Sequence, residues 1–189
     1  MSVLPDKLTF TQFLADWLKM MKTSVETTTF AGYLQTVNNK IIPYFDKHFP
    51  KLQLRDVTPK HIQDHYTYDM TDNGVSANTV IHRHANIRKA LQYAFKTGLI
   101  DSNPADKVQR PKKKPHPCEP YNAAELEKLF KAVKGTRFEL GVILAAFYGL
   151  RRGEAVGLKW SAIDFERKTI TISHTVVETM VNGRRTRQT

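Results

Sequence analysis

A nine-residue stretch at residues 109–117 divides the chain, because neither a helix nor a sheet can continue through it. Its sequence, QRPKKKPHP, holds three prolines, four Lys or Arg residues and no carboxylate. Proline lacks the backbone N–H that helices and sheet ladders need, and a segment of like charges extends itself. We therefore expect a basic tether at residues 109–117, between a first domain at residues 1–108 and a second at residues 118–189.

Residues 1–108 carry apolar side chains at the three- and four-residue spacing of amphipathic helices. Capping residues mark the helix starts, and Gly98 and the Asp72-Asn73-Gly74 turn mark helix ends. The pattern predicts a small four-helix domain. Its expected helices follow Thr9 to about Met21, span about Val25–Ile42 and stop before Pro43, run from Thr58-Pro59 to about Met70, and follow Ser76 to about Lys96.

Residues 118–189 contain shorter helices followed by candidate strands, which indicates an α+β arrangement with a small antiparallel sheet. One helix is expected after Asn122, and a more buried one from about Phe138 to Tyr148. The expected strands lie at Ile163–Phe165 and Thr169–Thr175, and Val181-Asn182-Gly183-Arg184 is typical of a further hairpin turn. The fold class expected for the whole chain is therefore mainly α.

The strongest chemical signal is FYGLRRGEAVGLKWSAID at residues 147–164. Gly149 can adopt the left-handed conformation that ends a helix, and a new helix is expected from Arg152, with Glu154, Leu158 and Trp160 on its faces. Arg151 would then lie at a helix N-terminus, where free N–H groups favour an anion, and its guanidinium can clamp a phosphate. Glu154 is placed to orient that guanidinium. The alternative is an ordinary helix–helix turn with a surface arginine.

This stretch resembles the first catalytic-arginine motif of the tyrosine recombinases, the phage and transposon integrases, written T-G-L-R-x-x-E-x-x-x-L-x-W-x-D-I-D. Tyr148 stands where the motif usually has Thr, and Ala162 where it usually has its first Asp. The resemblance implies that residues 1–108 form the helical SAM-like core-binding domain and that residues 118–189 begin the catalytic domain. The matching residues are Gly149, Leu150, Arg151, Glu154, Leu158, Trp160, Ile163 and Asp164.

The resemblance also implies a reaction in which a tyrosine attacks a DNA phosphodiester and forms a 3′-phosphotyrosine link, with no metal or nucleotide cofactor. Arg151 corresponds to the first catalytic arginine and Glu154 to its supporting carboxylate. The hairpin lysine, the H-x-x-R motif and the late tyrosine of the family are not found, since all seven tyrosines lie at or before Tyr148. We therefore expect a truncated recombinase that does not cleave DNA by itself. Its second domain, with an incomplete sheet, is expected to be marginally stable.

In the family, the second and fourth helices of the core-binding domain face the DNA. Asn and Arg side chains can read base edges, whereas Lys, Thr and His mostly hold phosphates. The alternatives are a merely solvated helix face and a linker that only improves solubility. The expected DNA-binding residues are Thr29, Tyr33 and Lys40 on the second helix, Asn78, Thr79, His82, Arg83, Asn86 and Lys89 on the fourth, and Lys112, Lys113 and Lys114 in the linker.

Composition favours a nucleic-acid partner, because the net charge is +11 and the pI is about 9.8. The single cysteine, Cys118, excludes an internal disulfide, and no signal peptide or membrane-spanning run is found, so a cytoplasmic location is expected. His61 and His65 have the spacing of metal ligands, but no third ligand is evident and no metal is expected.

The expected partners are double-stranded DNA and further copies of the protein on that DNA, and the expected role is integration or excision of a phage or mobile element. Two other functions remain open at this point. The chain could be a non-catalytic DNA-binding regulator or decoy, or a helical protein-interaction domain whose cations are incidental.

Overall fold

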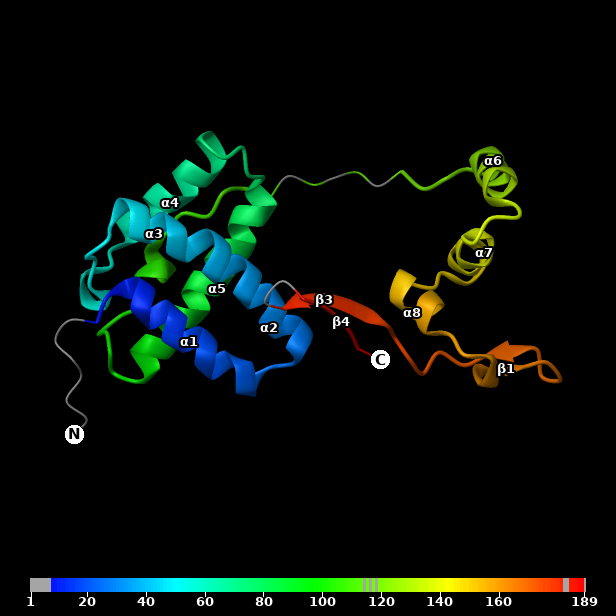
Figure 1. Cartoon of the computed structure of the whole chain (residues 1–189). Coiled ribbons are helices and arrows are strands. Elements are labelled where there is room, and N and C mark those ends of the chain that lie inside the picture. The colour runs from blue at the N-terminus through cyan, green and yellow to red at the C-terminus, as the bar shows by residue number, and fades with distance from the viewer. Residues whose placement is uncertain (1–7, 114, 116, 118, 182–183, 189) are drawn as a thin grey trace. The chain divides into compact units, whose positions relative to one another are not determined.

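The computed structural model describes residues 8–113, 115, 117, 119–181 and 184–188, with side chains described as far as Glu178. The chain divides after residue 116 into two compact units. Figure 1 labels the helices and strands of each unit.

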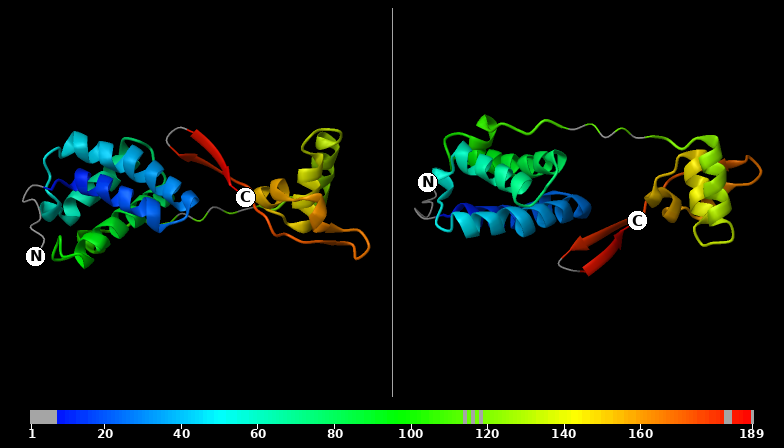
Figure 2. Two further views of the ribbon diagram at one scale, coloured as in Figure 1. Left: turned by 60° about the horizontal axis from the view of Figure 1, so that its bottom comes forward. Right: turned by 90° about the horizontal axis from the view of Figure 1, so that it is seen from above.

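The first unit is built from four helical rods, as the sequence predicts (Figure 2). Three of them start at side-chain caps, where Thr9, Thr58 and Ser76 accept hydrogen bonds from backbone N–H groups three residues on. Gly98 adopts the left-handed conformation just after the last rod. The elements are α1 (Phe10–Ser24), α2 (Thr27–Tyr33), η1 (Leu34–Ile41), α3 (Ile42–His48), η2 (Leu54–Asp56), α4 (Pro59–Thr71), α5 (Ala77–Lys96) and η3 (Pro104–Lys107).

The second rod is longer than expected, because the helix does not stop before Pro43. Residues of η1 form a π-helix, in which the N–H of Ile42 donates to the carbonyl of Val37. A new α-helical register then starts at Ile42, and Pro43 occupies its first turn, where the missing N–H is not needed. The expected end at Pro43 was therefore wrong, and the rod continues to His48.

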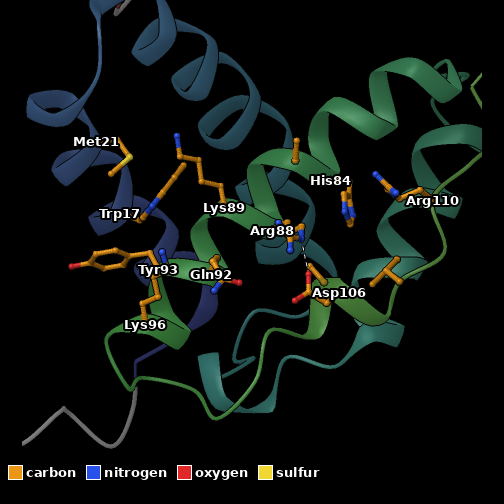
Figure 3. A pocket seen from close by; sticks show the side chains of 13 residues that line it. Trp17, Met21, His84, Arg88, Lys89, Gln92, Tyr93, Lys96, Asp106 and Arg110 are labelled. Carbon is orange, nitrogen blue, oxygen red and sulfur yellow. Dashed lines mark hydrogen bonds and ion pairs between the residues drawn. The ribbon is translucent and has the colours of Figure 1, made fainter.

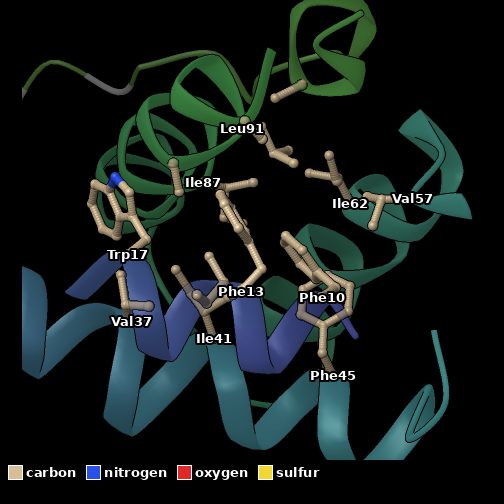
Figure 4. Close-up of a cluster of buried hydrophobic side chains, with 14 of the residues drawn as sticks. Phe10, Phe13, Trp17, Val37, Ile41, Phe45, Val57, Ile62, Ile87 and Leu91 are labelled. Carbon is tan, nitrogen blue, oxygen red and sulfur yellow. The ribbon is translucent and has the colours of Figure 1, made fainter. Parts of the chain in front are cut away.

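The core of the first unit lies between the rods (Figure 4). Phe10 of α1 contacts Phe45 of α3 edge to face, with 4.8 Å between ring centroids. Ile62 of α4 and Ile87 of α5 are fully buried in the same cluster. This packing fixes which face of α5 turns to the inside and which remains free to bind a ligand.

The second unit has shorter elements. Its helices confirm the starts expected after Asn122 and near Phe138, and Asn122 caps the first of them by accepting from the N–H of Glu125. The elements are α6 (Ala123–Val133), α7 (Glu139–Tyr148), α8 (Arg152–Gly157), η4 (Trp160–Ala162), β1 (Ile163–Asp164), β2 (Thr169–Ile170), β3 (Val177–Val181) and β4 (Arg184–Gln188).

The strands of the described residues form two separate antiparallel pairs, β1 with β2 and β3 with β4. Ile163 pairs with Ile170, and Lys168 has a positive φ of 53° in the connecting turn. The second expected strand was too long, because β2 ends at Ile170 and does not reach Thr175. Val181 pairs with Arg184, as a hairpin requires, while the two connecting residues lie outside the described residues. The fold class, mainly α with a small antiparallel sheet, is confirmed.

Helix α7 is less buried than its apolar sequence predicts. Among the described residues of this unit, Leu144 is the only large apolar side chain that is buried. Phe147 stacks on Phe130 of α6 with ring centroids 5.5 Å apart, yet it remains 71% exposed. The expectation of a buried helix was therefore wrong within this chain, because the described residues supply too little apolar surface to cover it.

Candidate functional site

The backbone around Arg151 has the predicted local conformation. Gly149 ends α7 with a φ of 67° and a ψ of 21°, in the left-handed region that glycine adopts without strain. Arg151 is then extended and directly precedes α8. The new helix is shorter than expected, because α8 ends at Gly157, so Leu158 and Trp160 do not lie on it.

Glu154 holds Arg151 by two contacts. Its Oε2 accepts from the backbone N–H of Arg151 at 2.8 Å, and its Oε1 accepts from the guanidinium Nη1 at 3.1 Å. The backbone N–H of Arg151, and then its guanidinium, hold the pKa of the Glu154 carboxyl below the usual value. The carboxylate is therefore ionised at neutral pH. The Arg151 side chain is 87% exposed, so its other N–H groups point to solvent and are free to meet an anion.

The segment before β3 packs closely on α8. The N–H of Val176 donates to the carbonyl of Gly153 at 3.0 Å, and a Cβ on Gly153 would come within 2.8 Å of the Val176 carbonyl oxygen. A Cβ on Gly157 would come within 3.0 Å of the His174 carbonyl oxygen. Both glycines are needed for this contact. This contact was not predicted from the sequence, although two glycines spaced by four in a helix signal a close approach.

In the first unit, α5 carries most of the expected DNA-binding residues. Thr79, His82 and Lys89 are exposed, while Asn78 and Asn86 are half-buried. Asn86 Nδ2 donates to the carbonyl of His82 at 2.8 Å, which leaves the Asn86 side chain partly committed to its own helix.

Arg83 was wrongly placed on the outer face. It is 8% exposed, and its Nη1 forms a buried ion pair with Asp69 Oδ1 of α4. Arg83 lies one turn from Val80 and from Ile87, both fully buried, so it shares the inward face of α5. Its guanidinium neutralises a buried carboxylate and is not available to read a base edge.

Two of the expected DNA-binding residues, Tyr33 of α2 and Lys89 of α5, contact each other. Lys89 Nζ on α5 donates to the Tyr33 hydroxyl at 2.5 Å and lies 4.9 Å from the centre of the same ring. The Tyr33 ring packs at 5.4 Å on that of Trp17, which is 2% exposed. This stack of two aromatic rings and a cation links α1, α2 and α5 and orients Lys89.

The remaining expected residues are placed as follows. Thr29 on α2 and Lys40 on η1 are exposed, and so are Lys112 and Lys113. Lys114 lies outside the described residues.

A groove along α5 contains further cations that the sequence analysis missed. It encloses about 820 Å³ and is lined by α1, α5 and the segment after α5 (Figure 3). Arg88 Nε binds Asp106 Oδ1 at 2.6 Å across one wall. Lys96 and Arg110 line the same groove. A repeat of polar residues four apart along α5, at Arg88, Gln92 and Lys96, was the available signal.

The two histidines with metal-ligand spacing have other contacts. His61 Nδ1 accepts from the N–H of Thr58 at 3.1 Å. His65 is fully buried, and burial lowers its pKa to about 4, against a smaller opposite effect of Asp69. Across the part of the chain that the structure describes, no three potential metal ligands cluster. Within the same part, none of the helices has the length and apolar character needed to cross a membrane.

Residues 9–70 match the phage integrase N-terminal SAM-like domain. The chain is similar to the phage integrases in this segment. Two proteins extend this relationship beyond the first unit: an integrase of Saccharopolyspora erythraea, 25% identical over 87% of this chain and 37% of its own length, and a tyrosine recombinase XerC-like protein of Caldanaerobacter subterraneus subsp. tengcongensis, 25% identical over 92% of this chain and 45% of its own length. The chain thus spans less than half the length of either protein.

Solved structures show the same fold. The Tn1549 transposon integrase in complex with circular intermediate DNA has a TM-score of 0.74 at 19% identity, over 93% of this chain and 57% of that one. A lambda integrase dimer bound to a COC′ core site has a TM-score of 0.70 at 20% identity, over 96% of this chain and 48% of that one. Together with the sequence matches, this confirms the predicted resemblance of the chain to the tyrosine recombinases.

Proposed function

We propose that this chain is the DNA-binding portion, with the first part of the catalytic domain, of a site-specific tyrosine recombinase. The first unit binds double-stranded DNA through α5 and the adjoining end of α2. The second unit supplies Arg151 to the phosphate that is cleaved. The complete recombinase cleaves and rejoins DNA through a 3′-phosphotyrosine intermediate during integration or excision of a mobile element, and copies of it associate on the DNA.

The arrangement of Arg151 and Glu154 carries the catalytic part of this proposal. Negative charge develops on the phosphate oxygens during attack, and a cation held in place stabilises that charge without reorganising. Glu154 takes one edge of the guanidinium and the adjacent backbone N–H, which leaves the rest of the guanidinium facing solvent. Arg151 is therefore built to contact a phosphate rather than to stabilise the fold.

The free polar face of α5 supports the DNA-binding part. His82 and Lys89 are exposed on the side opposite the buried residues, and Tyr33 orients Lys89 from α2. A helix of this kind fits a major groove about 12 Å wide. Binding should be strongly salt-dependent, since each phosphate contact releases condensed counterions. No binding at low salt would refute the proposal and favour a protein-interaction domain.

Substitution of Arg151 in a complete recombinase that contains this sequence tests the catalytic part. Arg151→Lys keeps one positive charge but loses the planar fork, so strand cleavage should fall by about 10²–10³-fold while DNA affinity is nearly unchanged. Arg152→Lys is the matched control, because the neighbouring side chain is also exposed and is not held by Glu154. Equal cleavage by both variants would contradict the assigned role.

A further inference from the structure

The groove beside α5 continues the surface with Asn78 and His82 toward the C-terminal end of that helix, and it has walls from other segments. One wall comes from α1, through Trp17 and Met21, and the other from Asp106 and Arg110, after the end of α5 (Figure 3). Its floor is the C-terminal half of α5. The groove is open to solvent along α5.

The charge of the groove is strongly positive. Its lining includes Arg88, Lys89, Lys96 and Arg110, against one carboxylate, that of Asp106. Burial, followed by the effects of Arg110 and Arg88, lowers the pKa of His84, so this histidine adds no charge at neutral pH. A polyanion is the ligand that such a surface attracts.

Two of the four cations are held in place by neighbouring side chains. Tyr33 orients Lys89, and Asp106 orients Arg88. Asn103 is buried, and its Nδ2 donates both to the carbonyl of Arg88 and to Gln92 Oε1, each at 3.2 Å. The floor of the groove is therefore fixed before any ligand arrives, which reduces the entropy that binding would cost.

The length of α5 relates the groove to the candidate base-reading face. Asn78 and Lys96 are 18 residues apart, or about 27 Å along a helix that rises 1.5 Å per residue. The major groove is only about 12 Å wide. When α5 crosses the major groove with Asn78 and His82 in it, the half of the helix from Lys89 to Lys96 lies over the flanking sugar-phosphate backbone.

We propose that this groove holds the phosphate backbone of one DNA strand beside the site read by the N-terminal half of α5. The inference rests on the proposed DNA-binding function and deepens it. Arg88, Lys96 and Arg110 make phosphate contacts that raise affinity for any sequence, and Lys89 belongs to both surfaces. Among polyanions, DNA is favoured because the groove adjoins Asn78 and His82 on the same helix, whereas an acidic polypeptide would use the cations of the groove alone.

The test is DNA binding by the whole chain, measured by fluorescence anisotropy over a series of salt concentrations. Each phosphate contact contributes about −0.9 to the slope of log K against log salt. Between 1 M and 0.1 M salt, one contact therefore raises affinity about eightfold. Lys96→Gln/Arg110→Gln should therefore weaken binding about 60-fold at 0.1 M salt and reduce the slope by about 1.8. The loss should be the same for any duplex sequence. Lys51→Gln is the control, since it removes an exposed cation outside the groove.

The outcomes separate this inference from the function on which it rests. A wild-type chain that binds no DNA even at low salt refutes the proposed function. A wild-type chain that binds with a steep salt slope, while the double variant behaves like Lys51→Gln, overturns the groove alone. A third result would also overturn it: the double variant loses affinity for a labelled poly-glutamate peptide but keeps its affinity for DNA. Unchanged far-UV circular dichroism shows that the variants remain folded.

Discussion

Arg83 should be essential for the stability of the first unit and not a direct contact to DNA. Its guanidinium pairs with Asp69, which is 1% exposed. Asn73 Nδ2 reaches the same carboxylate at 3.5 Å, and His65 Nε2 lies 3.6 Å from the other oxygen. His65 is neutral at pH 7 because its pKa is lowered to about 4. Arg83→Met would thus leave a buried carboxylate with no cationic partner.

The size of the effect follows from the burial. Removing one partner of a buried ion pair costs about 3–5 kcal/mol, because the other charge stays in a poorly solvated site. Small domains have a total stability of about 5–15 kcal/mol, and 1 kcal/mol shifts the Tm of a domain this size by about 4–8 °C. Arg83→Met should therefore lower the Tm of the first unit by at least about 12 °C.

Urea and thermal unfolding of the whole chain can measure this change. Trp17 is 2% exposed and belongs to the first unit, so a red shift of its fluorescence reports on that unit. Trp160 of the second unit is 77% exposed and should change little. The double variant Asp69→Leu/Arg83→Met removes both charges and should lose less stability than the two single changes added together. Wild-type stability of Arg83→Met would refute the argument and return Arg83 to the candidate DNA contacts.

Three further predictions concern both units. The folded state keeps His65 neutral while the unfolded state binds a proton below pH 6.5, so stability should fall by up to about 3 kcal/mol as the pH drops from 6.5 to 4. Urea midpoints at several pH values test this, and a His65→Gln variant with the same pH dependence would contradict it. Gly149→Ala should destabilise the second unit by about 1–2 kcal/mol because of the positive φ, while Gly141→Ala within α7 should stabilise it by about 0.5–1 kcal/mol. Proteolysis of the second unit should therefore be faster in Gly149→Ala and slower in Gly141→Ala. A change in the same direction in both variants would contradict this prediction. Chymotrypsin should cut at the exposed Phe147 and Phe165 before it cuts the first unit, whereas simultaneous cleavage, seen by mass spectrometry, would show that the units are equally stable.

The helices of the first unit could be predicted because their signals are local. Thr9, Thr58 and Ser76 each cap a helix through a hydrogen bond to a residue three positions on, and such contacts depend on nearby sequence alone. The error at Pro43 has a physical cause too. Proline opposes a continuing α-helix, but a change to π-type hydrogen bonds before it moves the proline into a first turn.

The errors in the second unit arise from partners that a local pattern does not specify. Thr169–Thr175 has the composition of a strand, but a strand forms only as far as a neighbour pairs with it, and β1 offers two residues. In the same way, α7 is apolar enough for a core, yet Phe147 and Tyr148 are exposed because little apolar surface packs on them. Propensity predicted the type of element, and tertiary contacts decided its length and burial.

The two candidate surfaces differ in how far sequence alone can define them, for the same reason. The Arg151 site is made by residues within one turn of chain, so spacing was enough to predict that Glu154 would hold the guanidinium. The groove takes its walls from α1 and from residues after α5, and only the packing of the four rods brings Lys89 and Arg110 to one surface. Arg83 and Lys89 illustrate the distinction on a single helix. They are cations six residues apart, and the neighbours of α5, not its own sequence, determine that one stabilises the core while the other faces a ligand.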